Sequence, residues 1–408
     1  MKLFWTLLLI PGLLFAQTPS VSPSQSPQST PTPKPTDFPK DYYDSRERFR
    51  SACPVSPDEN TVCEIFPVDP QNDFSVDSLF WRAENSKKIL VLVSGVHGIE
   101  TYAGAAVQRD FVEENLSRFL DQGISVYLVH ALNPYGYANN SRVTANNVDL
   151  NRNFPSKQDA DWKPNAGFQK LKEILAPENI SGPGWFSFFG FSFKLLWRIA
   201  TFQFTVDEMN QAIAGGQREE ARGLFYGGTA PEPQVEWLKR QLDEKLQGFE
   251  EALLIDIHTG LGERGVLHLM PSDEPAPTGA DLRARLFGTE SNEVYKITTE
   301  ATKGFYSVAG DFLDFAEERG PEGLKTAAMT MEFGTKGTSI PAQLGSLHTM
   351  ASENARRILP WTQERDIAAS RADFMELFAP QDLEWRDGIR NKGRAFFQQV
   401  LTRWSAQP

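Results

Sequence analysis

At residues 89–100 the chain reads ILVLVSGVHGIE. The apolar residues before Ser94 form an unbroken run of strand length, which is typical of a strand buried on both faces of a sheet. Gly95 interrupts the run, so His97 should lie just beyond the carboxyl end of the strand, where open α/β sheets bind their ligands. The residues that follow have the spacing of an amphipathic helix, which places Glu100 in its first turn.

A second segment repeats this arrangement. The sequence LLIDIH, residues 253–258, is another strand-like run that ends at a histidine. His97, Glu100 and His258 supply two imidazoles and one carboxylate, a ligand set that catalytic zinc takes while leaving a fourth position for water. Strand alternation puts Asp256 on the same face as His258, where its carboxylate can orient the imidazole. We therefore predict one zinc ion and a hydrolase.

The other histidines, His130, His268 and His348, lack such neighbours. A single histidine after a strand is usually structural. We interpret these three as structural or surface residues, because only His97 and His258 combine a strand end with a nearby carboxylate.

Two further segments carry groups suited to amide hydrolysis. The sequence AAMTMEFGT, residues 327–335, places Glu332 within an apolar strand, where a carboxylate is rare unless it is paired or functional. Such a glutamate can act as general base towards metal-bound water and then as proton donor to the leaving amine. Arg142 and Asn151 add a planar guanidinium and an amide suited to a carboxylate, although a single surface arginine is usually only a solvated charge.

In this order the motifs resemble the carboxypeptidase A-like zinc metallopeptidases, and most of all a bacterial branch catalogued as a domain of unknown function. They are His-Gly-x-Glu from His97, Asn-Pro-x-Gly from Asn133, an arginine followed by Asp-x-Asn-Arg-Asn-aromatic from Asp149, Asp-x-His ending at His258, and the strand-borne Glu332. The resemblance covers roughly residues 51–361. It implies an α/β fold, a three-layer α/β/α sandwich with a mixed, largely buried sheet.

The resemblance also implies roles for individual residues. The zinc ligands would be His97, Glu100 and His258, and the catalytic carboxylate Glu332. Arg142 matches the arginine that polarises the scissile carbonyl and stabilises the oxyanion. Asn151 and Arg152 match the pair that holds a substrate's terminal carboxylate, and Tyr306 matches the mobile tyrosine that caps the substrate.

Composition agrees with an exported enzyme. With 408 residues and 40% hydrophobic content the chain can bury a large α/β core, and its net charge of −12 argues against a nucleic-acid partner. The apolar stretch after Lys2 predicts a signal peptide at 1–16, followed by a disordered Pro/Ser/Thr-rich tether at 17–40 and a catalytic domain at 41–408. The two cysteines, Cys53 and Cys63, predict a disulfide and a periplasmic or secreted location.

An aromatic insertion at about residues 160–235 separates the halves of the predicted site. Its segment WFSFFGFSFKLLWRIA, residues 185–200, contains Lys194 and Arg198, and a membrane span there would put the two halves of one site on opposite sides of a bilayer. We expect helices packed on the domain, with weak contact of 185–200 with a membrane surface as the alternative.

The sequence thus predicts an exported, monomeric zinc metallocarboxypeptidase that acts on peptides. A zinc deacylase or amidase of acylated amino acids or cell-wall peptides is the first alternative, because related folds share the ligand pattern. A catalytically silent binding protein is the second. Glu332 and Arg142 argue against silence, since a protein that only binds has no need of a buried carboxylate beside zinc.

Overall fold

The computed structural model describes residues 38–155, 164–176, 185–272, 277–288, 290–298, 308–359 and 364–406. All of these belong to one structural unit. The predicted signal peptide at 1–16 and nearly all of the predicted tether at 17–40 lie outside the described residues, and so does Tyr306.

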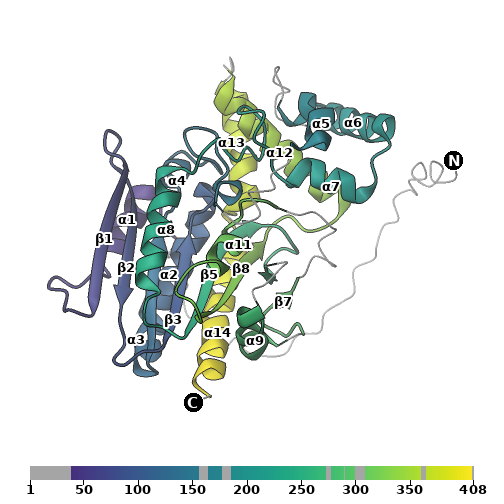
Figure 1. The fold of residues 1–408 in the computed structure, drawn as a ribbon. Helices are drawn as coiled ribbons and strands as arrows, with labels where there is room; N and C mark the ends of the chain where they lie inside the picture. Colours follow the sequence, from purple (N-terminus) through teal and green to yellow (C-terminus); the bar gives the residue numbers. More distant parts are fainter. Residues whose placement is uncertain are drawn as a thin grey trace, which may run out of the picture. The chain divides into compact units, whose positions relative to one another are not determined.

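The centre of the fold is an eight-stranded mixed sheet with the strand order β1-β2-β4-β3-β5-β8-β6-β7 (Figure 1). The strands are β1 (Thr61–Asp69), β2 (Phe74–Trp81), β3 (Lys88–Ser94), β4 (Ile124–His130), β5 (Glu251–Gly260), β6 (Leu267–Pro271), β7 (Lys296–Ile297) and β8 (Lys325–Gly334). The central strands β4, β3, β5 and β8 are parallel, whereas β1, β2 and β6 pair antiparallel with neighbours. The carboxyl ends of the four central strands therefore meet at one edge of the sheet.

Both faces of the central strands are buried. In β3, Leu90 and Leu92 pack into the core on one face, while Ile89, Val91 and Val93 pack into the core on the other. This two-sided burial is the physical reason why the strand reads as an unbroken apolar run.

Helices cover the two faces of the sheet (Figure 1). The longer helices are α1 (Tyr42–Arg50), α2 (Thr101–Glu114), α5 (Ala166–Leu175), α6 (Trp185–Phe202), α7 (Val206–Ala214), α8 (Pro233–Lys245), α9 (Pro277–Phe287), α12 (Ile340–Ile358), α13 (Glu364–Phe378) and α14 (Leu383–Ser405). The shorter ones are η1 (Gly98–Glu100), α3 (Leu116–Asp121), α4 (Pro134–Ala138), η2 (Leu150–Arg152) and α11 (Phe312–Glu317). Helices α2, α9 and α14 share a core with one face, and α8 and α11 with the other. The predicted three-layer α/β/α sandwich with a mixed, largely buried sheet is confirmed.

Helices α5, α6, α7 and α12 build a separate, smaller core. Its buried side chains include Phe168 and Leu171 of α5, Leu195 of α6 and Leu347 of α12. The aromatic segment 185–200 is thus helical and packs on its neighbours, while the boundaries of the insertion, about 160–235, stay a prediction. Among the described helices, none combines the length and the hydropathy that a bilayer crossing requires.

The predicted disulfide between Cys53 and Cys63 is confirmed. It ties the loop after α1 to strand β1, at the edge of the sheet. A disulfide favours an oxidising compartment.

Candidate metal centre

His97 and Glu100 lie on a turn that is fixed to a neighbouring loop. The turn follows β3, and the backbone N–H of Gly98 donates to the carbonyl of Arg142 at 3.1 Å. A Cβ atom on Gly98 would lie 2.2 Å from the carbonyl carbon of Gly136, so only glycine permits this approach. The close packing of these two segments brings Arg142 next to His97 and Glu100.

The Asn-Pro-x-Gly motif shapes that neighbouring loop. The side chain of Asn133 accepts a hydrogen bond from the Gly136 N–H at 2.9 Å, and its amide donates to the Arg142 carbonyl at 3.1 Å. Pro134 occupies the first turn of α4, where its missing N–H costs nothing. The motif is therefore structural here, because it holds the loop that carries Arg142.

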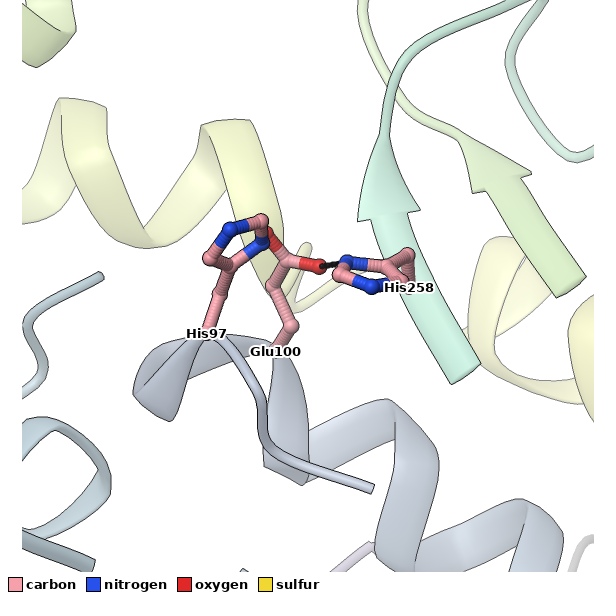
Figure 2. A group of neighbouring side chains, drawn as sticks. All are labelled: His97, Glu100 and His258. Carbon is pink, nitrogen blue, oxygen red and sulfur yellow. Dashed lines mark hydrogen bonds and ion pairs between the residues drawn. The ribbon is translucent and has the colours of Figure 1, made fainter. Parts of the chain in front are cut away.

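Figure 2 shows that the side chains of His97, Glu100 and His258 point toward one another. One ligand atom from each lies within 4.8 Å of the others. Glu100 stands between the histidines, with Oε1 2.9 Å from Nδ1 of His97 and Oε2 2.9 Å from Nδ1 of His258. All three are at least 96% buried, since their exposed fractions are 3%, 1% and 4%. The predicted juxtaposition of the three residues is present.

The group fits a metal ion. Although Glu100 Oε1 is near, the Nδ1 atom of His97 has no hydrogen-bond partner among the described residues. A buried polar atom without a partner is costly and calls for an explanation such as a bound ion. Two imidazole nitrogens and a carboxylate oxygen are donors that zinc accepts.

The electrostatics of the group also favour a cation. Although burial opposes ionisation, the charges of His97 and His258 hold the pKa of Glu100 well below its usual range. Although burial opposes protonation, Asp256 and Glu100 raise the pKa of His258 well above its usual value. Buried carboxylates thus attract positive charge to the site, and a divalent ion supplies that charge in place of protons.

Each histidine has a second carboxylate behind it. Asp149 Oδ1 lies 3.0 Å from Nε2 of His97, and the carboxylate of Asp256 contacts Nε2 of His258. A carboxylate that holds Nε2 leaves Nδ1 to face the metal site. The predicted contact of Asp256 with His258 is confirmed.

The contact of Asp149 with His97 is one that sequence reasoning missed. Asp149 precedes Asn151 in the Asp-x-Asn-Arg-Asn motif, but it is 52 positions from His97. Local spacing carries no information at that distance. The Asp-x-Asn-Arg-Asn motif was the signal in the sequence that drew attention to this aspartate.

Glu332 lies beside the candidate metal ligands, on the next strand. In the parallel register of β5 and β8 it is directly opposite His258. Its Oε1 accepts a hydrogen bond from the Leu261 N–H at 2.7 Å, and the residue is 7% exposed. Burial, together with the charge of Glu100, raises the pKa of Glu332 to about 7. A carboxyl group that titrates near neutrality is suited to accept and return a proton.

Arg142 lies at the edge of the same group. Its Nη1 is 3.3 Å from Glu100 Oε1, and its Nε is 3.2 Å from Asp149 Oδ2. The rings of Phe225 and Phe378 lie 5.7 Å and 5.8 Å from the guanidinium carbon. Two carboxylates and two aromatic rings therefore orient this side chain, and neither ring was predicted from the sequence.

Asn151 and Arg152 lie in the short helix η2, after the loop that follows Arg142. The guanidinium of Arg152 donates to the carbonyl of Ala214 at 3.2 Å and 2.6 Å and to the carbonyl of Asn151 at 2.7 Å. The Phe225 ring lies 5.4 Å from it, so one ring contacts both arginines. The Asn151 side chain accepts a hydrogen bond from the Phe312 N–H at 2.9 Å. The role of this pair in holding a carboxylate stays a prediction, as does the role of Tyr306.

The remaining histidines are not among the three residues that could hold the metal. Each contacts a hydroxyl group: His130 that of Ser45 at 3.2 Å, His268 that of Thr298 at 2.8 Å and His348 that of Ser187 at 2.9 Å. Within the described part of the chain, His97, Glu100 and His258 form the one set of side chains that could hold a metal. This agrees with the structural interpretation of the other three.

Comparison with known proteins places the chain in a family. No curated protein matches the sequence. Several solved structures are similar in fold at low identity. Thrombin-activatable fibrinolysis inhibitor has 14% identity and a TM-score of 0.46 over 78% of this chain and 73% of that chain. The carboxypeptidase A of Helicoverpa armigera has 13% identity and a TM-score of 0.40, over 81% of this chain and 71% of that chain. A metallo-carboxypeptidase from Pseudomonas aeruginosa has 13% identity and a TM-score of 0.39, over 83% of this chain and 70% of that chain.

The family model described as protein of unknown function (DUF2817) matches residues 38–392. This match extends over nearly all of the described residues and includes every predicted metal ligand. The expected membership of a family of unknown function is thereby confirmed. The chain belongs to the DUF2817 family.

Proposed function

We propose that the protein is an exported zinc-dependent hydrolase of amide bonds that acts on peptides as a carboxypeptidase. The observation that carries this proposal is the convergence of His97, Glu100 and His258, with Glu332 opposite His258 on the next strand. Structural zinc sites are usually closed by four protein ligands, whereas catalytic sites keep three and an open position. Among the described residues this group supplies three.

Glu332 is the proposed proton carrier of the reaction. When bound, zinc would lower the pKa of a water molecule towards about 7 and polarise the scissile carbonyl. Glu332 takes a proton from the attacking water, because its buried carboxyl group titrates near pH 7. It then returns a proton to the leaving nitrogen. The hydrogen bond from the Leu261 N–H fixes one of its two oxygens for this task.

Arg142 is the proposed donor to the oxyanion that develops on the substrate carbonyl. Its ion pairs with Glu100 and Asp149 orient the guanidinium before any substrate binds. A donor that needs no reorganisation stabilises the transition state more than a mobile one. The Arg142 side chain is 17% exposed and lies beside the rings of Phe225 and Phe378, and this partial burial strengthens its electrostatic effect.

The proposed carboxypeptidase specificity rests on Asn151 and Arg152, which would bind the free carboxylate of the substrate, and on Tyr306, which would close over it. An arginine fork binds a carboxylate through two parallel hydrogen bonds. Arg152 donates to main-chain carbonyls in this structure, and a bound carboxylate would have to replace those bonds. That observation favours the second candidate function, a zinc amidase or deacylase whose substrate needs no free terminal carboxylate.

The two candidates differ in their need for a free carboxyl terminus. We expect the wild type to cleave free-ended peptides and to cleave amidated ones poorly. Arg152→Ala should lose about 10- to 150-fold in kcat/KM on free-ended peptides only, since a charged hydrogen bond is lost. Arg48→Ala, which removes a surface arginine paired with Asp44 on α1, is the matched control and should not change either rate. Equal cleavage of both peptides by the wild type would replace the carboxypeptidase proposal with the amidase one.

The proposed export is supported by the disulfide between Cys53 and Cys63. We expect the mature protein to begin near Gln17. Mass spectrometry of the protein from its native compartment tests this, and a chain that retains Met1 with both thiols free would contradict export.

A further inference from the structure

Helix α6 has two apolar faces, and the fold covers one of them. Phe191 and Leu195 are 8% and 1% exposed and belong to the core shared with α5, α7 and α12. The opposite face carries five large apolar side chains that are 56–75% exposed, namely Phe186, Phe189, Phe193, Leu196 and Trp197. We call these five residues the α6 stripe.

The α6 stripe is continuous along the helix. At 3.6 residues per turn its members fall within an arc of about 100°. Other strongly exposed apolar residues of the described chain, such as Ile65 on β1 and Ile340 on α12, lie on separate elements. Figure 1 shows α6 beside α5, away from the central sheet. A continuous apolar patch of this kind marks an interaction surface, whereas single exposed residues do not.

The charges beside the α6 stripe are positive. Helix α6 contains no acidic residue, and its two charged residues are Lys194 and Arg198. Arg198 pairs with Glu173 of α5, whereas Lys194 is exposed and has no ion pair among the described residues. Lys170 of α5 is also exposed, and its ammonium group lies 5.8 Å from the ring of Phe202 at the end of α6. Helix α6 itself is thus basic, although Glu173 of α5 pairs with Arg198 and Glu208 of α7 lies within reach of the charge of Lys170, and this contrasts with the net charge of −12 of the whole chain.

We propose that the α6 stripe docks the protein on the surface of a phospholipid membrane, with the axis of α6 in the plane of the interface. Phenylalanine, leucine and tryptophan on one face and lysine at the rim are the composition of interfacial helices. The aromatic side chains enter the boundary between head groups and acyl chains, while Lys194 and Lys170 attract anionic head groups. A second copy of the chain fits the stripe less well, because it would bring two basic rims together.

Docking does not depend on the proposed hydrolase activity, but it has a consequence for the metal centre. The segment that follows α6 contributes Phe225 to the surroundings of Arg142, and the Ala214 carbonyl at the end of α7 binds Arg152. Because α6, α7 and α5 share one core, docking through α6 would hold the metal centre at a fixed distance from the membrane.

The experiment is co-flotation of the full-length mature protein with lipid vesicles. We expect the wild type to float with vesicles of phosphatidylcholine and phosphatidylglycerol at 3:1, and to float less with phosphatidylcholine alone. The double variant Phe193→Ser/Trp197→Ser should lower the partition coefficient by at least about tenfold on both, since two aromatic side chains no longer insert. Lys194→Glu should weaken binding to the anionic vesicles only.

The matched control is Ile65→Ser/Ile340→Ser, which removes two apolar side chains that are 58% and 73% exposed outside α6. It should float as the wild type does, and all variants should keep the wild-type circular dichroism spectrum. Two results would overturn the proposal. One is a wild type that stays unbound with both vesicle types. The other is a wild-type dimer in light scattering that dissociates in the Phe193→Ser/Trp197→Ser variant, which would assign the stripe to a second copy.

Discussion

His258 and His130 lie near the ends of the two strands that flank β3, yet their surroundings are opposite. Both strands are parallel to β3, and the two histidines are 4% and 0% exposed. His258 contacts the carboxylates of Glu100 and Asp256, which raise its pKa well above the usual value although burial opposes this. His130 stacks on the ring of Phe49, and burial, helped by the charge of Arg50, lowers its pKa to about 3.

The difference shows that a strand end does not by itself make a histidine a metal ligand. His130 also has a carboxylate nearby, because Asp77 is its partner in the register of β2 and β4. Arg50 engages that carboxylate at 2.8 Å, so the charge does not act on the imidazole. At His258, Arg142 also pairs with Glu100, but the other oxygen of Glu100 still lies 2.9 Å from the imidazole and Asp256 binds the ring directly. Whether a buried histidine can bind a cation therefore depends on whether the nearby carboxylates contact its imidazole or pair with an arginine instead.

The largest expected effect on activity is the loss of His258, and the same test at His130 should have no effect. His258→Ala should lose the metal and lower kcat/KM by about 10³-fold or more, because three protein ligands are the usual minimum for catalytic zinc and the metal contributes several kcal/mol. His130→Gln should keep both the metal and the rate. Metal content and peptide hydrolysis, measured on both variants, check this. Loss of metal in His130→Gln would break the comparison.

Glu332→Gln tests the carboxylate next to His258. The amide keeps the shape and loses the base, so kcat should fall by about 10²- to 10⁴-fold while metal content stays at the wild-type level. The matched control is Glu251→Gln at the other end of β5, a carboxylate bound by Arg285 and Trp404. Unchanged turnover in Glu332→Gln would remove this residue from the proposed mechanism.

Asp256→Asn tests whether the carboxylate behind His258 tunes the site. Metal affinity, measured by competition with a chelator, should fall about 10- to 100-fold, and kcat at saturating metal should change less. Asp77→Asn makes the same chemical change beside His130 and should leave the affinity unaltered. Equal metal affinities for the wild type and Asp256→Asn would show that the charge of Asp256 does not influence metal binding.

The smallest effect concerns the pH dependence of stability at His130. The unfolded chain protonates this imidazole near pH 6.5, whereas the folded chain keeps it neutral to about pH 3. The unfolded state therefore binds more protons between these values, so the stabilisation is present above pH 6.5 and is lost as pH falls. Relative to His130→Gln, the wild-type free energy of unfolding should drop by about 2 kcal/mol between pH 7 and pH 5. Urea unfolding measures this, and equal pH slopes would contradict the lowered pKa.

The parts of the fold that the sequence predicted are those in which local pattern and burial coincide. Strands β3 and β5 are buried on both faces, so their sequences are apolar runs, and the residues at which these strands end can be identified from the sequence. The proposed metal ligands lie at those ends, so two strands and one helical turn were enough to identify them as candidates. Glu332 was visible because a carboxylate interrupts an otherwise apolar strand.

The contacts that the sequence could not predict join residues far apart in the chain. The pairing of Asp149 with His97 depends on the packing of two loops that Gly98 and Gly136 allow. The rings beside Arg142 come from Phe225 and Phe378, in segments with no motif. The bonds of Arg152 to the carbonyl of Ala214 cross 62 positions of sequence. Such contacts arise from tertiary packing, and helical or strand periodicity in the sequence does not predict them.

We propose above all that His97, Glu100 and His258 hold a zinc ion that the enzyme needs. Elemental analysis of the protein purified from its native compartment, with His97→Ala as the comparison, tests it most directly. We expect one equivalent of zinc in the wild type, with activity that is lost on chelation and restored by zinc. His97→Ala should hold less than about a tenth of an equivalent, because it keeps only two of the three ligands. A full equivalent of zinc in His97→Ala, or activity that survives complete removal of metal from the wild type, would contradict it.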